Sequence, residues 1–138
     1  MSVRLEVTWE GLEGLHAYIA RTLPEAFNES SAAALDRAAD DGVDRAKQLV
    51  PVDTGALQQS IRKERKAQPA GNITYTGIRA GGYVRNPKTG RIVDYATYVE
   101  RGTSRQRPQP YLRPALHWAS RMIPVYFWEE LSRRVELG

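Results

Sequence analysis

The strongest constraint on the fold is a helical pattern that fills the segment between Pro24 and Pro51. Proline suits the first turn of a helix, and the residue before a proline avoids helical angles, so the pattern predicts one long helix over 24–50. Acidic residues near its start and basic residues near its end agree with the helix dipole. Most residues on its apolar stripe are small, so we expect close packing on a sheet or another helix. The stripe consists of Phe27, Ala34, Leu35, Ala38, Val43, Ala46, Leu49 and Val50.

Alternating apolar residues predict strands on both sides of this helix. Residues 2–9 alternate cleanly, as in a half-buried strand, and a short helix is expected over 12–23. Residues 60–66 are polar and charged, as in an exposed edge strand. Residues 72–80 alternate less regularly, and Gly77 is expected to mark a bulge.

A β-hairpin is expected over 83–93, after a turn signal at Gly81-Gly82 and with a second turn signal at 86–90. Its tip carries Arg85, Lys88 and Arg91 and no apolar anchor. We therefore expect this arm to project from the domain.

The next segment, 95–116, combines a short helix with a stiff basic loop. An aromatic face predicts a helix over 95–101, and Gly102 stands where a left-handed terminal residue is needed. The loop that follows has almost nothing apolar to bury, and its Arg105 and Arg107 have no acid nearby in the sequence. Such a loop is typical of a contact outside its own domain.

The last helix is expected from Leu112 to about Val135, where apolar residues follow a 3.6-residue period. Pro124 falls inside this pattern and should kink or divide the helix. Trp118 and Trp128 lie at the edge of the stripe. Each is expected in the core, with exposure at a partner contact as the alternative.

Composition indicates one soluble folded domain over 1–138, because 26% of residues are charged and 41% hydrophobic. The chain has no cysteine, which excludes disulfides, thiolate catalysis and cysteine–metal sites. Charges interrupt the N-terminus before any signal-peptide core develops, and no stretch approaches the ~20 apolar residues of a membrane span. We therefore expect synthesis in the cytoplasm and no membrane contact.

Charge is distributed unevenly along the chain. Residues 1–56 hold ten acids and five bases, whereas the remainder holds fifteen bases and six acids. This polarity is compatible with nucleic-acid binding, with a head-to-tail ring in which acidic and basic faces of two copies meet, or with an unevenly charged solvated surface.

The sequence Asp53-Thr54-Gly55 matches the catalytic turn of aspartic proteases, which a chain with one motif would complete by homodimerising. The long preceding helix and the lack of a later framing strand argue against this. The structural alternative is a turn in which Asp53 accepts hydrogen bonds from nearby backbone N–H groups.

Other chemistries lack support, and no catalytic residue, metal ligand or cofactor is expected. His16 and His117 lie far apart without an acid in helical register, and Asp40, Asp41 and Asp44 span more than one helix face among basic neighbours. Basic residues interleaved with tyrosines are typical of nucleic-acid binding, so the alternative function is a nucleic-acid-binding accessory protein. No motif that recognises specific bases is present.

Three blocks of residues stand in order within about 33–119. The first block is Pro51, Asp53, Thr54, Gly55 and Leu57; the second is Tyr95, Ala96, Tyr98, Val99, Glu100, Gly102 and Thr103; the third is Gln109, Pro110, Tyr111, Leu112, Arg113, Pro114 and Ala115. Taken together, these blocks resemble the neck and minor-tail-component family of long-tailed bacteriophages. At Arg101 the family often has an aromatic residue.

The resemblance implies an α+β fold, in which a small antiparallel sheet with a projecting β-hairpin is packed by a long helix and a C-terminal helix. It also implies a virion protein that forms a ring, of six or twelve copies, at the neck. That ring would complete the tail or join head to tail around the DNA channel, beside other neck, head-completion and tail proteins and with non-specific contact to genomic DNA.

On this interpretation, charged and aromatic residues of the C-terminal part contact neighbouring subunits or the next ring, while Asp53 and Glu100 hold turns or meet a neighbour's arginines. The expected interface residues are Arg85, Lys88, Arg91, Glu100, Arg105, Arg107, Tyr111 and Arg113.

Overall fold

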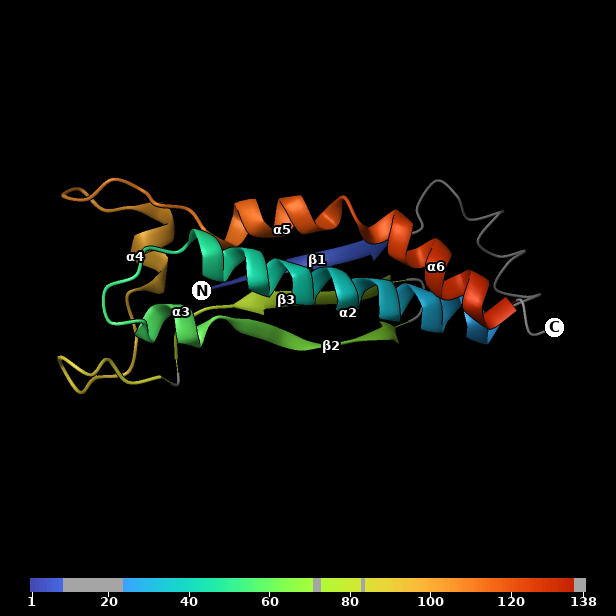
Figure 1. Ribbon diagram of the computed structural model, residues 1–138, viewed down its shortest axis with the longest axis horizontal. Helices are drawn as coiled ribbons and strands as arrows, with labels where there is room; N and C mark the ends of the chain where they lie inside the picture. The colour runs from blue at the N-terminus through green and yellow to red at the C-terminus, as the bar shows by residue number, and fades with distance from the viewer. Residues whose placement is uncertain (9–23, 71–72, 83, 136–138) are drawn as a thin grey trace.

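A three-stranded antiparallel sheet lies against the long helix in the computed structural model, which describes residues 1–8, 24–70, 73–82 and 84–135 (Figure 1). The helix expected over 12–23 lies outside these residues. The α+β fold class is confirmed. The elements are β1 (Ser2–Thr8), α2 (Pro24–Leu49), α3 (Ala56–Ser60), β2 (Arg62–Ala70), β3 (Ile73–Arg79), α4 (Ala96–Arg101), α5 (Leu112–Ser120) and α6 (Ile123–Val135).

The central strand of the sheet is β3, which pairs with β1 on one side and β2 on the other. The expected edge position of the charged strand, β2, is therefore confirmed. Gly77 is in the middle of β3, where a Cβ atom would lie 2.4 Å from the carbonyl oxygen of Val3. Glycine is required there because the backbone of β1 approaches so closely.

The bulge lies in β2 and not at Gly77 itself. The register of β2 against β3 shifts between Lys63 and Arg65 and again between Arg65 and Gln68. In this irregular stretch the N–H of Ala67 donates to the Asp36 carboxylate of α2, 2.7 Å away. A side chain of the long helix thus satisfies a backbone group near the irregularity.

The long helix α2 packs on β2 and β3, and its 26 residues include the predicted stripe of small buried side chains. Ala34, Ala38 and Ala46 are fully buried, which lets the backbone of α2 approach its neighbours. α5 packs beside it against β1, and α6 continues along the N-terminal half of α2 (Figure 1). The core therefore lies between α2, α5 and the sheet.

The C-terminal helical pattern is divided into two helices, as Pro124 predicts. α5 ends at Ser120 and α6 begins at Ile123, so that Pro124 occupies the first turn of α6, where a missing N–H costs nothing. The turn between them is closed by a 3.0 Å hydrogen bond from the N–H of Met122 to the carbonyl of Ala119.

One short helix, α3, was not expected from the sequence. It follows the Asp53-Thr54-Gly55 turn directly and buries Ala56 and Leu57 in the main core. Because α3 is one turn long, it shows no helical periodicity that a sequence pattern could reveal.

Candidate interaction surface

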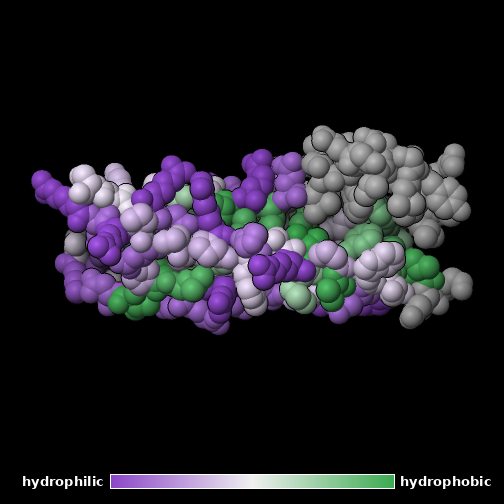
Figure 2. All heavy atoms as spheres, turned by 90° about the horizontal axis from the view of Figure 1, so that it is seen from above, coloured by the Kyte–Doolittle hydropathy of each residue, from purple (hydrophilic) through white to green (hydrophobic). Residues whose placement is uncertain are grey.

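Three segments that are distant in the sequence meet at one end of the elongated molecule, on the left in Figure 1. They are the turn 50–55 after α2, the hairpin 84–93, and α4 with the loop 102–110. Seen from above, hydrophilic side chains reach outward at this end (Figure 2). We call this region the loop end, and the opposite region, where α2 begins and α6 finishes, the α6 end.

The Asp53-Thr54-Gly55 turn is held by its threonine. The hydroxyl oxygen of Thr54 accepts a hydrogen bond from the N–H of Ala56 at 3.2 Å, and Gly55 has a left-handed conformation with a φ of 84°. The expectation that Asp53 accepts backbone N–H groups is therefore corrected. Its carboxylate is 75% exposed and lies 2.8 Å from the ammonium of Lys88 in the hairpin. Within one chain this arrangement favours a structural turn over a proteolytic site.

Glu100 is buried at the end of α4 and connects it to the start of α5. Its Oε2 accepts the N–H of Tyr111 at 2.6 Å and that of Leu112 at 2.9 Å, and its Oε1 accepts the N–H of Arg113 at 3.0 Å. These are N–H groups that a helix N-terminus leaves without intrahelical partners, and a negative charge there is favoured by the helix dipole. Glu100 is 4% exposed. The expectation that it holds a turn is confirmed.

Tyr111 is fully buried beside this carboxylate. Its hydroxyl donates to the carbonyl of Ala96 at 3.1 Å, and burial, with the nearby charge of Glu100, raises the pKa of Tyr111. The burial of Glu100 and Tyr111 corrects the expectation that they contact a neighbouring subunit, because their own chain already encloses both side chains.

The loop 102–110 is closed at its base by backbone hydrogen bonds. The N–H of Gln109 donates to the carbonyl of Val99 at 2.8 Å, and the N–H of Thr103 donates to the carbonyl of Gln106 at 2.9 Å. Gly102 has a φ of 75°, and a Cβ atom there would lie 2.7 Å from the nitrogen of Pro108. The expected glycine stop after α4 is thus confirmed, and the loop has a defined shape.

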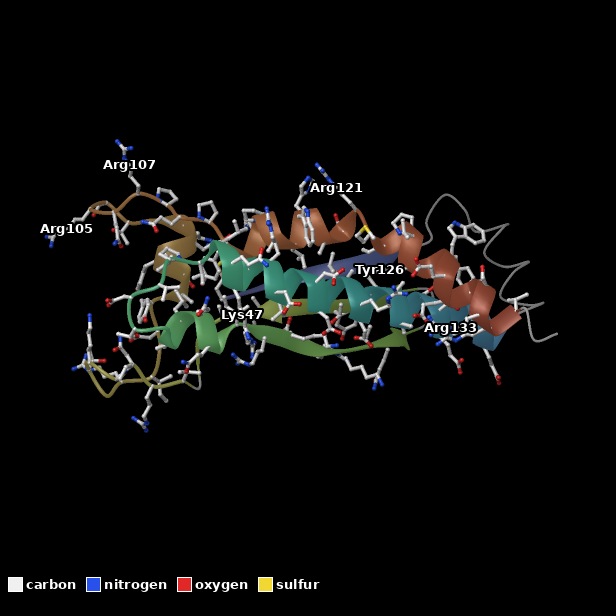
Figure 3. The ribbon with its side chains drawn as sticks, in the orientation of Figure 1. Lys47, Arg105, Arg107, Arg121, Tyr126 and Arg133 are labelled. Atoms are coloured by element: carbon white, nitrogen blue, oxygen red, sulfur yellow. The ribbon has the colours of Figure 1, made fainter. Side chains whose placement is uncertain are left out.

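Arg105 and Arg107 extend from this loop away from the rest of the molecule (Figure 3). Both are exposed, and within the described part of the chain neither guanidinium has an ion pair or a hydrogen bond. Arg113 is also exposed, at the first turn of α5. These side chains are available to an external partner.

The hairpin projects, but its two arms, over 84–93, form a bridge and no regular pair of strands. A single bridge joins Arg85 to Ile92, and the turn is closed by a 2.8 Å hydrogen bond from the N–H of Asn86 to the carbonyl of Arg91. The guanidinium of Arg85 donates back to the carbonyl of Gly90, and Lys88 is paired with Asp53. The hairpin tip is therefore basic, but Lys88 is already neutralised by its own chain.

The loop end also exposes apolar side chains, among them Leu49, which was wrongly expected on the packed stripe of α2. Leu49, Val52 and Tyr98 are 39%, 60% and 59% exposed. Tyr98 belongs to the aromatic face that predicted α4, and its side chain points to solvent instead of the core. Between the turn 50–55 and α4 lies a groove of about 350 Å³, whose lining includes Pro51, Val52, Leu57, Tyr95, Tyr98 and Val99.

At the α6 end, ion pairs join α6 to α2. The carboxylate of Glu130 is 5% exposed and accepts hydrogen bonds from Arg134 at 2.7 Å and from Arg37 at 3.2 Å. The hydrogen bond from Arg134 and the neighbouring positive charges lower the pKa of Glu130 below its ordinary value. Tyr126, labelled in Figure 3, donates to Asp41, and this bond raises its pKa.

Both tryptophans of α5 and α6 are exposed, which corrects the expectation of core positions. Trp118 is 44% exposed with the guanidinium of Arg45 over its ring, and Trp128 is 63% exposed. Val125, one turn before Trp128, is 46% exposed. The side of α6 that faces α2 instead carries Phe127, whose ring meets that of Phe27 edge-on at 5.3 Å.

The acidic and basic parts of the chain neutralise each other in several places. Lys63 pairs with Asp36 and Asp40 across α2 and β2, at 3.5 and 3.0 Å. Arg134 pairs with Glu29 at 3.3 Å. Part of the charge asymmetry in the sequence is therefore used inside the molecule, whereas Arg105 and Arg107 are among the basic residues that have no ion pair within the described part of the chain.

No group of histidine, cysteine and carboxylate side chains capable of holding a metal ion occurs among residues 1–8, 24–70, 73–82 and 84–135. His117 is exposed, and His16 lies outside these residues. Asp40 and Asp41 bind separate partners, Lys63 and Tyr126. Within the same ranges, no helix is both long and apolar enough to cross a membrane.

The chain matches the model of a known protein family over more than half of its length. The model of the HK97-gp10-like family, described as "Bacteriophage HK97-gp10, putative tail-component", matches residues 14–102. The matched range includes the Asp53-Thr54-Gly55 turn, the hairpin and α4, and it ends at Gly102, before the arginine loop. No curated protein and no solved structure gives a significant match.

Proposed function

The chain belongs to the HK97-gp10-like family of bacteriophage tail components, and on that premise we propose that it forms a ring at the phage neck, where it completes the tail or joins it to the head around the DNA channel. Its place in the virion follows from the family. The ring, with six or twelve copies, and the position at the neck are the proposal.

The observation that carries the proposal is the pair of unpaired arginines on a loop of defined shape. Arg105 and Arg107 sit beyond a base closed by backbone hydrogen bonds and by the buried carboxylate of Glu100. A loop that is already ordered loses little conformational freedom on binding, so its charges are well placed for a protein–protein contact. Such a contact requires a partner that supplies acids, either an adjacent subunit or a neighbouring neck protein.

Charge reversal tests this role in assembled particles. The double variant Arg105→Glu/Arg107→Glu should give separate heads and tails, counted by electron microscopy of lysates, with a loss of infectious particles. The matched control is Lys66→Glu/Arg121→Glu, which makes the same charge change on exposed residues of β2 and of the turn between α5 and α6. Normal infectious particles from the loop variant would contradict the proposal.

The same two arginines also favour a second candidate function, in which the chain is an accessory protein that binds DNA. Phosphate contacts would make binding strongly salt-dependent. A salt-sensitive shift of duplex DNA by a monomeric protein, lost in the loop variant and kept in the control, would favour this function over the ring.

A further inference from the structure

The groove at the loop end has the character of a binding site for an apolar side chain. Two segments separated by about forty residues of sequence form its walls, and its exposed rim includes Val52 and Tyr98. Leu49 is exposed nearby. Apolar side chains gathered around a concave site, on a surface otherwise rich in charge, indicate a place where another protein docks.

A surface of matching character lies at the α6 end. Val125 and Trp128 are one turn apart on the exposed side of α6, and Glu129 follows with a carboxylate that is 51% exposed. Residues spaced i, i+3 and i+4 form one stripe along a helix, the usual arrangement of a helix that binds in a groove. We call these three residues the α6 ridge.

The ridge cannot reach the groove of its own chain. α6 and the turn 50–55 lie at opposite ends of the elongated molecule (Figure 1). If the two surfaces bind each other, they do so between copies. A contact between two different surfaces of identical subunits repeats from copy to copy and closes into a ring when the rotation permits.

Charge complementarity supports the same pairing. The loop 102–110 lines the groove through Gln106 and carries the exposed Arg105 and Arg107, for which the described residues provide no acid. The α6 end presents the exposed Glu25. Glu29 and Glu129 pair with Arg134 and Arg37 of their own chain, but their carboxylates remain 63% and 51% exposed, and such surface ion pairs contribute little and can exchange partners. Opposite charges around an apolar contact orient the approach of the two surfaces.

We propose that the α6 ridge of one copy binds in the groove between the turn 50–55 and α4 of the next, with Trp128 as the anchor. This inference rests on the proposed ring and names the two surfaces that build it. A tryptophan in a pocket is a common centre of binding energy, and each aromatic side chain buries about 150–250 Å². The arginine loop then lies at the rim of the contact.

Mixing of single variants tests the head-to-tail arrangement by native mass spectrometry. Tyr98→Ser damages the groove and leaves the ridge intact, whereas Trp128→Ser does the reverse; both residues are more than half exposed, so the fold should survive. Each variant alone should lose the assembly of the wild type. Mixed together they should form one-to-one heterodimers and nothing larger, because only one intact groove and one intact ridge can meet.

The matched control is Trp118→Ser, which removes a half-exposed tryptophan outside both surfaces and should assemble as the wild type does. Wild-type assembly by either Tyr98→Ser or Trp128→Ser would overturn the inference. So would a mixture that yields no heterodimers.

Cross-linking in purified particles extends the test to a chain that assembles only on the virion. The natural sequence has no cysteine, so Val52→Cys/Glu129→Cys, which keeps the Trp128 anchor, introduces the only thiols. Oxidation should give a ladder of covalent multimers, whereas Lys66→Cys/Glu129→Cys should not. Multimers with a lysine-reactive cross-linker but no cysteine ladder would overturn the inference and leave the ring standing. No multimers with either reagent would count against the ring itself.

Discussion

Two buried glutamates, one at each end of the molecule, are stabilised in different ways. Glu100 accepts hydrogen bonds from three backbone N–H groups at the start of α5. Glu130 accepts hydrogen bonds from the guanidinium groups of three arginines, on α2 and on α6 itself. Backbone donors are fixed by the helix, whereas arginine side chains are long and can rearrange. The joint between α4 and α5 is therefore set by backbone groups, whereas the ion pairs that help to attach α6 to α2 involve side chains that can rearrange.

The largest expected effect is at Glu100. Glu100→Ala leaves three N–H groups at a buried helix start without an acceptor, which should lower the free energy of unfolding by roughly 3 kcal/mol. The melting temperature should fall by about 10 °C, measured by circular dichroism. Glu129→Ala, at a half-exposed carboxylate, is the control and should change it little. A small change in melting temperature for Glu100→Ala would contradict the view that backbone hydrogen bonds make Glu100 more important to stability than Glu130.

Gly102→Ala should lower the free energy of unfolding by a smaller amount. This variant tests whether close packing at the base of the loop 102–110 excludes a side chain at Gly102. A side chain at a φ of 75° is strained, and its Cβ would meet Pro108 at under 3 Å. We expect a loss of about 2 kcal/mol in chemical denaturation. Gly90→Ala is the matched control, because its φ is also positive at 71° but its Cβ would meet nothing within 4 Å. Equal losses would show that strain alone, without packing, accounts for the effect.

The attachment of α6 should respond to pH. Because the pKa of Glu130 is lowered in the folded protein, its ionised form stabilises the fold above the unfolded carboxyl's pKa of about 4.3, and that stability is lost as the pH falls through the lower folded value. Glu130→Gln should therefore cost about 1–2 kcal/mol at pH 7 and progressively less below about pH 4.3. Denaturation curves at several pH values check this; a pH-independent difference would contradict it.

The smallest effect is expected for the exposed pair of Lys88 and Asp53. Both side chains are mostly solvent-exposed, at 65% and 75%, so Lys88→Gln should change stability by less than about 0.5 kcal/mol despite the 2.8 Å contact. Measurement by the same denaturation assay should place this variant beside the wild type. A larger loss would mean that the hairpin is held to the turn 50–55 by this pair.

Much of the fold could be predicted because local signals agreed with tertiary packing. The prolines that bracket α2, its stripe of alanines, the glycine after α4 and Pro124 at the start of α6 each act within a few residues of their own position. The structure confirms all four. α3 was missed because one turn of helix has no period, and the bulge was assigned to Gly77 although the extra residues lie in the strand opposite.

The surface was harder to predict than the fold. The sequence left Glu100 either to hold a turn or to meet a neighbour's arginines, and its partners are N–H groups eleven to thirteen residues later. Trp128 belongs to an apolar pattern on α6, yet α2 covers only one side of that helix. The groove forms only where the turn 50–55 meets α4, and no residue spacing in the sequence predicts that these two segments are neighbours. These features depend on which segments become neighbours.

The edges of the sheet restrict how copies of this chain can aggregate. β2 carries a run of charged residues, two register irregularities and Pro69, and each of these discourages another strand from adding to that edge. On the other edge, α5 lies alongside β1. Strand addition, the usual route to fibrous deposits, is thereby disfavoured even where many copies are crowded together. Any ordered association of this chain is left to its side chains and loops, so the geometry of assembly is decided by residues that evolution can change without rebuilding the sheet.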